Sequence, residues 1–175
     1  MKGVILAAGK GTRLRPLTDT RPKPLIPIAN KTILEWNLDA LNGLVDEVVI
    51  VIGYKGDMIK EKIGEKYGSM KIFYVEQKEQ KGTGHALQVC SDYVKGEKFI
   101  VLNGDDIFSQ EDIKKCLKHN YCVLGKEVED PENWGVLEQK DDHSLLKIDE
   151  KSIKAKSNIA NVGLYVLDEA VCAIE

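Results

Sequence analysis

The sequence predicts an α/β fold in which helices cover both faces of a mixed, mainly parallel sheet. Short apolar runs alternate with helical patterns from residue 3 to residue 119, and this order is typical of a parallel sheet covered by helices. After Pro131 the pattern changes to three short strand-like runs joined by polar segments, which predict an antiparallel or mixed addition to the sheet. The 175 residues suffice for one domain with a sizeable core.

The individual elements follow from hydrophobic periodicity. Apolar runs bounded by turn residues predict strands, at residues 3–8, 47–54, 70–76, 98–104 and 121–128. Apolar residues at helical spacing predict helices, at residues 32–44, 56–68, 83–94 and 109–119. Thr32 is a suitable N-cap for the first helix, and Ser109 with Asp112 has the form of a helix start. The three late strands are predicted at residues 134–139, 144–151 and 161–168.

Composition and charge exclude several classes of protein. A net charge of −3 gives no general affinity for nucleic acid. No run approaches the roughly 20 apolar residues of a membrane span, and the apolar stretch at residues 4–8 is too short for the core of a signal peptide. We therefore expect a cytoplasmic protein that binds neither nucleic acid nor membrane. Because no CxxC pair and no histidine at zinc-like spacing is present, we expect reduced thiols at Cys90, Cys116, Cys122 and Cys172.

A basic loop follows the first predicted strand. Gly9 and Gly11 let the backbone approach a ligand and expose N–H groups to an anion. The cationic residues of the loop are Lys10, Arg13, Arg15, Arg21 and Lys23. Because arginine grips phosphate with two parallel hydrogen bonds, the loop favours a polyphosphate ligand; the alternative is a solvated basic loop. The prolines at positions 16, 22, 24 and 27 argue against a long helix, so we expect an extended loop that wraps its ligand.

Two carboxylates follow another predicted strand. In an open parallel sheet, ligands collect at the carboxyl ends of the strands. In this sequence, the segments at those ends begin after Ala8, Gly53, Glu76 and Asn103. Asp105 and Asp106 lie in the last of these segments. Mg²⁺ is usually held by one or two carboxylates together with phosphates. A strand-end aspartate alone is more often a turn former, but beside a phosphate-binding loop these residues predict a magnesium site.

The stretch LAAGKGTRLRPLTDTRPKPLIPIANKTILEW, residues 6–36, closely resembles the signature of the sugar-1-phosphate nucleotidylyltransferases, also called NDP-sugar pyrophosphorylases. That signature joins a glycine-rich loop with an arginine to a downstream Pro-Lys-Pro. The resemblance implies the three-layer, Rossmann-like fold of the nucleotide-diphospho-sugar transferases. It also implies transfer of a nucleotidyl group from an NTP to a sugar 1-phosphate, with release of pyrophosphate.

The resemblance implies roles for residues on the nucleotide side. Arg13 would hold the departing pyrophosphate, and Lys23 would bridge the α-phosphate and the sugar phosphate. Asp105 would bind the catalytic Mg²⁺, whereas many relatives carry an uncharged residue at the position of Asp106. The implied nucleotide-binding residues are Leu6, Ala7, Ala8, Gly9, Gly11, Thr12, Arg13, Gln77, Gly82 and Thr83.

The segment EQKEQKGTGHAL, residues 76–87, resembles the base-binding segment of the family. Gln77 occupies the position of a glutamine that reads the pyrimidine edge. Its amide offers a donor and an acceptor, which suit the N3–H and carbonyl groups of uracil or thymine. The sequence GTGHAL is most similar to the corresponding sequence of UTP-using N-acetylglucosamine-1-phosphate uridylyltransferases. We therefore expect UTP or dTTP, and a sugar of the glucose 1-phosphate or N-acetylglucosamine 1-phosphate type.

Three later segments resemble the sugar side of the same family. The Gly135 backbone and the Asn161 side chain would contact the sugar. Glu150 would accept hydrogen bonds from the sugar hydroxyls, and Lys151 would hold the sugar phosphate. Because that phosphate is already an anion, the implied reaction needs no general base. We therefore expect neither a Ser-His-Asp set nor a nucleophilic cysteine.

The resemblance extends from residue 1 to about residue 166. We predict one domain over residues 1–175, with a nucleotide-binding half at 1–125 and the start of a sugar-binding half at 126–175. Relatives continue some tens of residues further and supply a second metal-binding Asp or Asn there. We therefore expect either a chain truncated at its C-terminus or a metal site that is completed in another way. Many relatives also carry a left-handed β-helix beyond that point.

Two other functions stay open. A non-catalytic regulatory or binding relative is favoured by the missing C-terminal metal ligand and opposed by Arg13, Lys23 and Asp105. A cytidylyltransferase acting on phosphocholine has a similar N-terminal signature, but a choline pocket needs an aromatic cage, for which only Trp134 and Tyr165 are obvious candidates. The expected partners are an NTP and a sugar 1-phosphate, and the oligomeric state stays open, a homo-oligomer included.

Overall fold

The computed structural model describes residues 1–150 and 156–173. Its parallel strands are β1 (Lys2–Ala7), β4 (Glu47–Ile52), β6 (Met70–Glu76) and β7 (Phe99–Asn103). Antiparallel strands extend the sheet on both sides: β5 (Lys66–Tyr67), β8 (Cys122–Glu127), β9 (Gly135–Gln139), β10 (Leu145–Glu150) and β11 (Ile159–Leu167). A small hairpin pairs β2 (Pro27–Ile28) with β3 (Lys31–Thr32).

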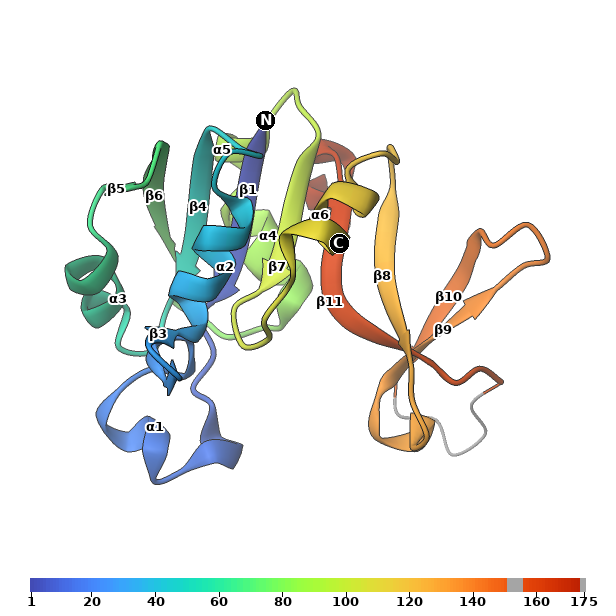
Figure 1. Ribbon diagram of the computed structural model, residues 1–175, viewed down its shortest axis with the longest axis horizontal. Coiled ribbons are helices and arrows are strands. Elements are labelled where there is room, and N and C mark those ends of the chain that lie inside the picture. The colour runs from blue at the N-terminus through green and yellow to red at the C-terminus, as the bar shows by residue number, and fades with distance from the viewer. Residues whose placement is uncertain (151–155, 174–175) are drawn as a thin grey trace.

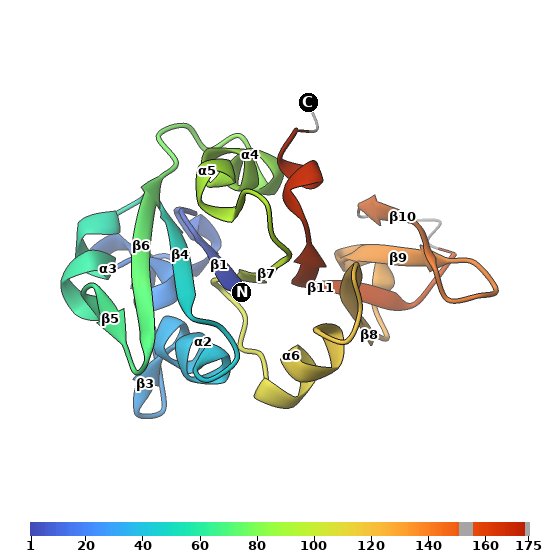
Figure 2. The same cartoon turned by 90° about the horizontal axis from the view of Figure 1, so that it is seen from above.

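Helices cover both faces of this sheet. The longer ones are α2 (Ile33–Leu41), α3 (Gly56–Ile63), α4 (Thr83–Val89) and α6 (Gln110–Cys116). The shorter ones are η1 (Thr12–Leu14), α1 (Leu17–Thr20), η2 (Lys23–Leu25), α5 (Ser91–Val94), η3 (Pro131–Asn133) and η4 (Glu169–Ala173). The strand order is β10-β9-β11-β7-β1-β4-β6-β5, with β8 paired to β11. Figures 1 and 2 show α2 and α6 on one side of the sheet and α4 and α5 on the other, which confirms the predicted three-layer, mixed and mainly parallel α/β fold.

The sheet separates two apolar cores. One contains Leu34 of α2 and the other contains Leu87 of α4. Val4 and Ile5, successive residues of β1, are both fully buried and belong to different cores. A strand that is buried on both faces has a continuous apolar sequence instead of an alternating one, which is why the aliphatic run at the start of the chain predicts β1 correctly.

The parallel strands end at the same edge of the sheet. β1 pairs in parallel with β4 and β7, and β4 pairs in parallel with β6. Ala7 lies opposite Ile52, Ile52 opposite Glu76, and Leu6 opposite Asn103. We call this the carboxyl edge, and we call the edge at which these strands begin the amino edge. The four segments that sequence analysis selected therefore start from the carboxyl edge.

Two helix starts are capped as predicted. The Thr32 hydroxyl accepts from the Glu35 backbone N–H (3.2 Å), and the Glu35 carboxylate accepts from the Thr32 backbone N–H (2.8 Å). At α6, the Ser109 hydroxyl accepts from the Asp112 backbone N–H (3.1 Å). Both caps satisfy backbone donors that have no partner in the first helical turn, so the starts of α2 and α6 are fixed by local sequence.

The helix predicted at residues 56–68 is shorter than expected. It ends at Ile63, because Gly64 has a left-handed φ of 73°. The residues that follow, Lys66–Tyr67, pair with β6 as strand β5. Pairing with the sheet thus takes precedence over the helical pattern of this segment.

Two other predicted helices also differ from expectation. The one at residues 32–44 ends at Leu41, because Asn42 has an extended backbone. The one at residues 83–94 breaks at Cys90, which separates α4 from α5.

The basic loop is not extended as predicted. No long helix forms, but η1, α1 and η2 follow one another as three short helical turns. Proline has no N–H and cannot continue a helix from within, yet it is accommodated at the start of a turn. Pro24 occupies such a place in η2. The loop therefore folds into compact turns at the carboxyl edge.

The late strands add an antiparallel ribbon, as predicted. β9 pairs with β10 in a register that sets Gly135 opposite Glu150, and β11 joins this ribbon to β7. In Figure 1 the ribbon projects from the rest of the sheet. Lys151 follows β10 directly and lies outside the described residues. Among the residues that are described, no helix is long and apolar enough to cross a membrane.

Candidate functional site

The four segments after β1, β4, β6 and β7 meet at the end of β1. The Tyr54 backbone N–H donates to the Ala8 carbonyl (3.2 Å). The Gln80 side chain donates to the same carbonyl (2.8 Å), and the Gly104 backbone N–H donates to the Leu6 carbonyl (2.9 Å). The carboxyl edge therefore holds one connected site, built around Leu6 and Ala8.

Two glycines permit this close approach. A Cβ on Gly53 would lie 2.8 Å from the Ala8 carbonyl oxygen, and a Cβ on Gly104 would lie 2.7 Å from the Leu6 carbonyl oxygen. Both distances are shorter than a carbon–oxygen contact allows. A side chain at either position would push the segments apart, so the packing of the site requires glycine there.

The glycine-rich loop is anchored at one point and open at another. Gly11 has a left-handed φ of 60°, and its carbonyl accepts a hydrogen bond from the Thr18 hydroxyl (3.0 Å). The Tyr54 hydroxyl donates in turn to the Thr18 carbonyl (3.0 Å). A Cβ on Gly9, by contrast, would meet nothing within 4 Å. The backbone at Gly9 therefore faces open space.

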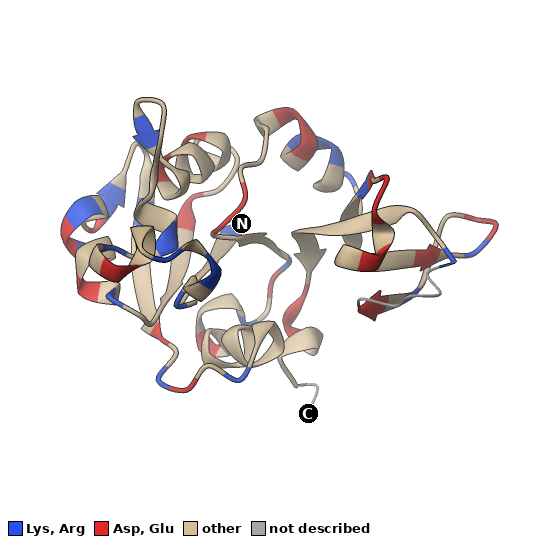
Figure 3. Cartoon of the chain, turned by 90° about the horizontal axis from the view of Figure 1, so that it is seen from below, with Lys and Arg blue, Asp and Glu red and all other residues tan. Residues whose placement is uncertain are grey.

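The cations of the loop divide into paired and unpaired groups. Lys23 Nζ lies 2.8 Å from Asp105 Oδ2, and the two side chains are 26% and 44% exposed. Arg15 pairs with Asp19 at 3.3 Å. Across the described ranges 1–150 and 156–173, no carboxylate pairs with the three other cations, which are Lys10, Arg13 and Arg21. Figure 3 views this edge from below, with the basic residues in blue. Three of the five loop cations are thus left without a carboxylate partner among the described residues.

Asp105 and Asp106 offer a donor set that suits Mg²⁺. Burial and the neighbouring Asp105 carboxylate raise the pKa of Asp106, and the Lys23 ammonium opposes this rise. Within the described residues, no group of three or more His, Cys, Asp or Glu side chains could enclose a metal. Mg²⁺ is commonly held by one or two carboxylates with phosphates and water as its other ligands, so the two adjacent aspartates fit that ion when a phosphate completes the site.

The Gln77 side chain lies beside the start of α4. It is only 5% exposed, and its Nε2 donates to the Gly82 carbonyl (3.1 Å) and lies 3.1 Å from His85 Nδ1. Because a carbonyl oxygen only accepts, the contact with Gly82 fixes which end of the amide is the nitrogen. That donor end is engaged inside the protein, while α4 begins at Thr83 as predicted.

The predicted sugar-side residues lie on the late strands. A Cβ on Gly135 would lie 2.8 Å from Glu150 Oε1, so the two residues are in direct contact across β9 and β10. Asn161 Nδ2 donates to the Tyr165 hydroxyl (2.8 Å), and Asn161 Oδ1 accepts from the Gly163 N–H (3.1 Å). Burial raises the pKa of Tyr165, and the Glu150 carboxylate adds to the rise. Gly135, Glu150 and Asn161 therefore belong to one neighbourhood, linked through Tyr165.

Sequence reasoning missed Asn37. This residue is fully buried in α2, yet its side chain reaches the turn that carries the aspartates: Nδ2 lies 2.8 Å from the Asp106 carbonyl oxygen. A signal was present, because Asn37 interrupts the apolar stripe of a helix predicted to face the core. A polar residue on such a stripe requires a partner.

Two of the four cysteines, Cys90 and Cys116, are buried thiols. All four are free, as expected. Burial raises the pKa of Cys90 and of Cys116 to about 12 each, so both are neutral thiols near pH 7, and the thiolate is the reactive form.

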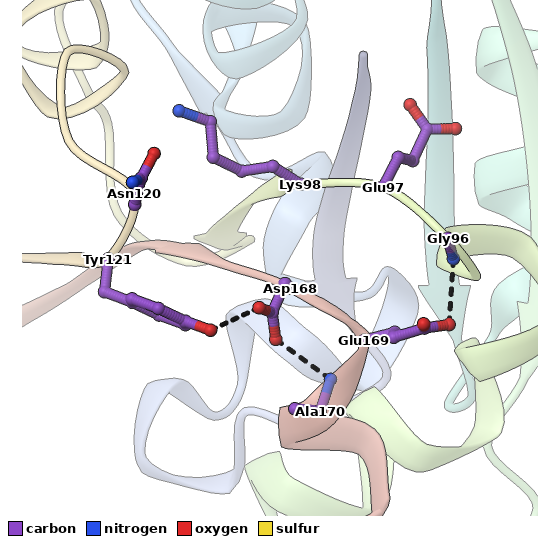
Figure 4. A pocket seen from close by; sticks show the side chains of 8 residues that line it. All are labelled: Gly96, Glu97, Lys98, Asn120, Tyr121, Asp168, Glu169 and Ala170. Carbon is purple, nitrogen blue, oxygen red and sulfur yellow. Dashed lines mark hydrogen bonds between the residues drawn. The ribbon is translucent and has the colours of Figure 1, made fainter.

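A hollow lies at the amino edge. It has a volume of about 510 Å³ and is lined by residues that flank β7 and β11 (Figure 4). Its charged side chains have partners within the protein. Lys98 donates to the His119 carbonyl (2.9 Å), Glu169 accepts from the Gly96 N–H (2.8 Å), and Asp168 accepts from the Tyr121 hydroxyl.

Comparison with known proteins agrees with this geometry. The chain matches the nucleotidyl transferase family over residues 2–175. It is 44% identical over 172 residues to the bifunctional protein GlmU of Methanocaldococcus jannaschii, covering 98% of this chain and 41% of that protein. It is 34% identical over 179 residues to the UTP–glucose-1-phosphate uridylyltransferase AglF of Haloferax volcanii, covering 98% of this chain and 73% of that protein. The chain thus spans less than half of the length of that GlmU.

A solved structure shows the same fold. It is that of a UDP-glucose pyrophosphorylase complexed with UDP-glucose, which superimposes with a TM-score of 0.84 and 25% sequence identity, covering 98% of this chain and 77% of that one. Signature, fold and sequence similarity agree, and the chain belongs to the nucleotidyl transferase family.

Proposed function

We propose that this chain is the nucleotidyltransferase domain of a Mg²⁺-dependent sugar-1-phosphate nucleotidylyltransferase. It would transfer a nucleotidyl group from UTP or dTTP to a sugar 1-phosphate of the glucose or N-acetylglucosamine type and release pyrophosphate. The single observation that supports this most is the contact between Lys23 and Asp105 (2.8 Å) beside loop cations that no described carboxylate neutralises. That combination suits a triphosphate together with a metal ion.

The chemistry depends on bringing two polyanions together. The sugar phosphate is itself the nucleophile, so positioning and charge neutralisation supply the catalysis. Lys23 is the cation nearest to the proposed metal-binding carboxylate, and it would offset charge on both reacting phosphates. Arg13, which is exposed and has no described carboxylate partner, would hold the departing pyrophosphate. The N–H groups around Gly9 and Gly11 would bind the remaining phosphate oxygens.

Asp105 would be the metal-binding carboxylate, with Asp106 beside it. When bound there, Mg²⁺ supplies Lewis-acid polarisation of a phosphate oxygen. The Lys23 ammonium already lies against the Asp105 carboxylate. Lys23 would therefore be close to any phosphate that binds at this carboxylate.

The substrates are proposed from relatives and from the segments that resemble them. AglF is named for UTP and glucose 1-phosphate, and the solved pyrophosphorylase holds UDP-glucose. Gln77 would face the base, and its amide oxygen is the acceptor available for an N3–H group. Gly135, Glu150 and Asn161 would contact the sugar, and Lys151 would hold its phosphate.

We propose that the nucleotide and the sugar bind to different parts of the sheet. Residues 1–125 contain all the parallel strands and the segments at their carboxyl ends, and they form the proposed nucleotide-binding half. Residues 126–175 contain β9, β10 and β11 and form the proposed start of the sugar-binding half.

Pyrophosphate release tests this proposal. The assay combines four NTPs with several sugar 1-phosphates, with and without Mg²⁺, on this chain and on a version extended at its C-terminus. We expect release that needs both substrates and Mg²⁺ and that is fastest with UTP or dTTP. UTP binding without release by either version would instead support a non-catalytic relative, and turnover of CTP with phosphocholine would support the cytidylyltransferase.

A further inference from the structure

Asn37 is a fully buried amide in an otherwise apolar helix face. Its neighbours on the buried stripe of α2 include Leu34, Leu38 and Leu41. A buried amide without hydrogen bonds is strongly destabilising, so a polar residue at this place needs partners on another element. The partners of Asn37 lie about 70 residues further along the chain, in the segment after β7.

Both ends of the Asn37 amide bind the backbone of that segment. Nδ2 donates to the Asp106 carbonyl oxygen (2.8 Å), and Oδ1 accepts from the Phe108 backbone N–H (3.2 Å). The Phe108 side chain is itself buried against the same core as α2. One side chain therefore fixes both ends of the three-residue turn at residues 106–108.

A second clamp holds the other end of the same turn. The Gly104 N–H donates to the Leu6 carbonyl (2.9 Å), and a Cβ on Gly104 would collide with that oxygen. Asp105 lies between the two clamps, and its carboxylate contacts Lys23 at 2.8 Å. The direction of the Asp105 side chain thus depends on backbone that β1 holds on one side and Asn37 holds on the other.

We propose that Asn37 is a positioning residue for the metal-binding turn: it fixes the backbone at Asp106 and Phe108, so that the Asp105 carboxylate faces the phosphates together with Lys23. This inference rests on the proposed function. It concerns a residue that touches neither substrate nor metal. Groups that orient metal ligands from behind change metal affinity by about ten- to a hundredfold when they are removed.

Gln110 provides a matched control. Gln110 is the first residue of α6, and its amide joins α6 to the C-terminal end of α2, through Nε2 contacts with the carbonyl oxygens of Ala40 (3.4 Å) and Asn42 (3.2 Å). These contacts lie at the C-terminal end of α2, beyond the turn that carries Asp105. Gln110→Ala removes the amide–carbonyl bonds between α6 and the end of α2, together with an exposed contact to Lys114 (2.9 Å), and leaves the Asp106 and Phe108 contacts in place.

The test compares UTP affinity in Mn²⁺ with UTP affinity in EDTA, by calorimetry, for the wild-type chain and for Asn37→Leu, Asn37→Ala and Gln110→Ala. Asn37→Leu keeps most of the side-chain volume and Asn37→Ala does not, so the two variants should differ in thermal midpoint. Both should nevertheless lose about tenfold or more of the gain in affinity that Mn²⁺ gives. Faster hydrogen exchange of the Phe108 amide should accompany that loss. Gln110→Ala should retain the Mn²⁺ gain within about twofold.

The outcomes separate the two proposals. A Mn²⁺ gain that is the same in wild type and in both Asn37 variants would overturn the positioning role and leave the proposed function intact. A wild-type chain whose UTP affinity is indifferent to Mn²⁺ would overturn the metal-dependent function together with the inference. An equal loss in Gln110→Ala would show that general loosening of α2 against its neighbours, and not Asn37, controls the turn.

Discussion

The two edges of the central sheet carry charged residues in opposite states. At the amino edge, the N-terminal ammonium pairs with Asp46 (3.0 Å), and Lys2 pairs with Glu97 (3.0 Å). At the carboxyl edge, Lys10, Arg13 and Arg21 have no carboxylate partner in the part of the chain that the structure describes. The amino-edge hollow also holds Lys98, whose ammonium donates to the carbonyl oxygens of Leu117 and His119, whereas the carboxyl edge gathers three cations without a described carboxylate partner in one loop.

This difference between the two edges indicates a structural role for the charges at the amino edge and a binding role for those at the carboxyl edge. Exposed ion pairs contribute little to stability, so the pairs at the amino edge mainly hold their own side chains in place. Concentrated cations repel one another, and they are stabilised when an anion arrives from outside. The carboxyl edge combines such cations with open backbone at Gly9 and a carboxylate at Asp105, which is why we assign the reaction to that edge.

The largest effect is expected from Lys23→Ala and Asp105→Ala. Each removes one half of the contact that we propose for charge stabilisation at the reacting phosphates. Loss of one electrostatic stabiliser of this kind costs about a hundred- to a thousandfold in kcat. Steady-state pyrophosphate release measures it, with circular dichroism to confirm folding. Lys31→Ala is the matched control, because Lys31 also pairs with an aspartate, Asp39, and is similarly exposed. Near-normal kcat in both site variants would contradict the assignment.

Arg13→Ala and Arg15→Ala sharpen the contrast between unpaired and paired cations. The two arginines lie two residues apart, but only Arg15 has a carboxylate partner, Asp19. Hydrogen bonds to charged groups contribute about 1.5–3 kcal/mol, so Arg13→Ala should lower kcat/KM for UTP by about ten- to a hundredfold. Arg15→Ala should lower it far less. Equal losses would show that general charge, and not pairing state, determines the effect.

Gln77→Ala should change base preference more than rate. If the amide oxygen accepts from an N3–H group, its loss removes one neutral hydrogen bond, and the preference for UTP over CTP should fall roughly three- to tenfold. Competition between the two nucleotides in one reaction measures this ratio. Gln80→Ala, which removes a side-chain bond to the Ala8 carbonyl instead, should leave the ratio unchanged. An unaltered ratio in Gln77→Ala would end the proposed role in base recognition.

The smallest effect is expected at the amino edge. A hydrogen bond to Asp168 raises the pKa of Tyr121 above its ordinary value of 10.0. A raised phenol pKa gives stability that is present below pH 10.0 and is lost as the pH rises through the folded value. Tyr121→Phe should therefore lower the thermal midpoint slightly near pH 8, the difference from wild type should shrink in alkali, and turnover should stay the same. A fall in turnover would mean that the amino edge takes part in the reaction.

Much of this fold was predictable because its signals are local. The cap at Thr32 and the aliphatic run of β1 act within a few residues, and the pattern of alternating elements leads from them to the sheet and its carboxyl edge. The segment at residues 56–68 misled the prediction, because its end depends on the left-handed conformation of Gly64 and on pairing of Lys66–Tyr67 with β6. Neither is visible in helical periodicity.

The candidate site also has parts that the sequence predicts and parts that it does not. The loop cations and Asp105 were predictable, because their chemistry and their places after strands follow from sequence order. The contact between Asn37 and Asp106 joins segments 69 residues apart, and the periodicity of the sequence does not indicate which segment Asn37 contacts. The inward turn of the Gln77 amide toward Gly82 likewise depends on side-chain packing at the start of α4.

The most direct measurement is a crystal structure of the chain soaked with UTP and Mg²⁺. We predict the triphosphate along residues 9–13, Arg13 and Lys23 on its oxygens, and the ion between Asp105 and the α-phosphate. Nucleotide density in the amino-edge hollow, or an Asp105 carboxylate turned away from the phosphates, would contradict the assignment of the reaction to the carboxyl edge.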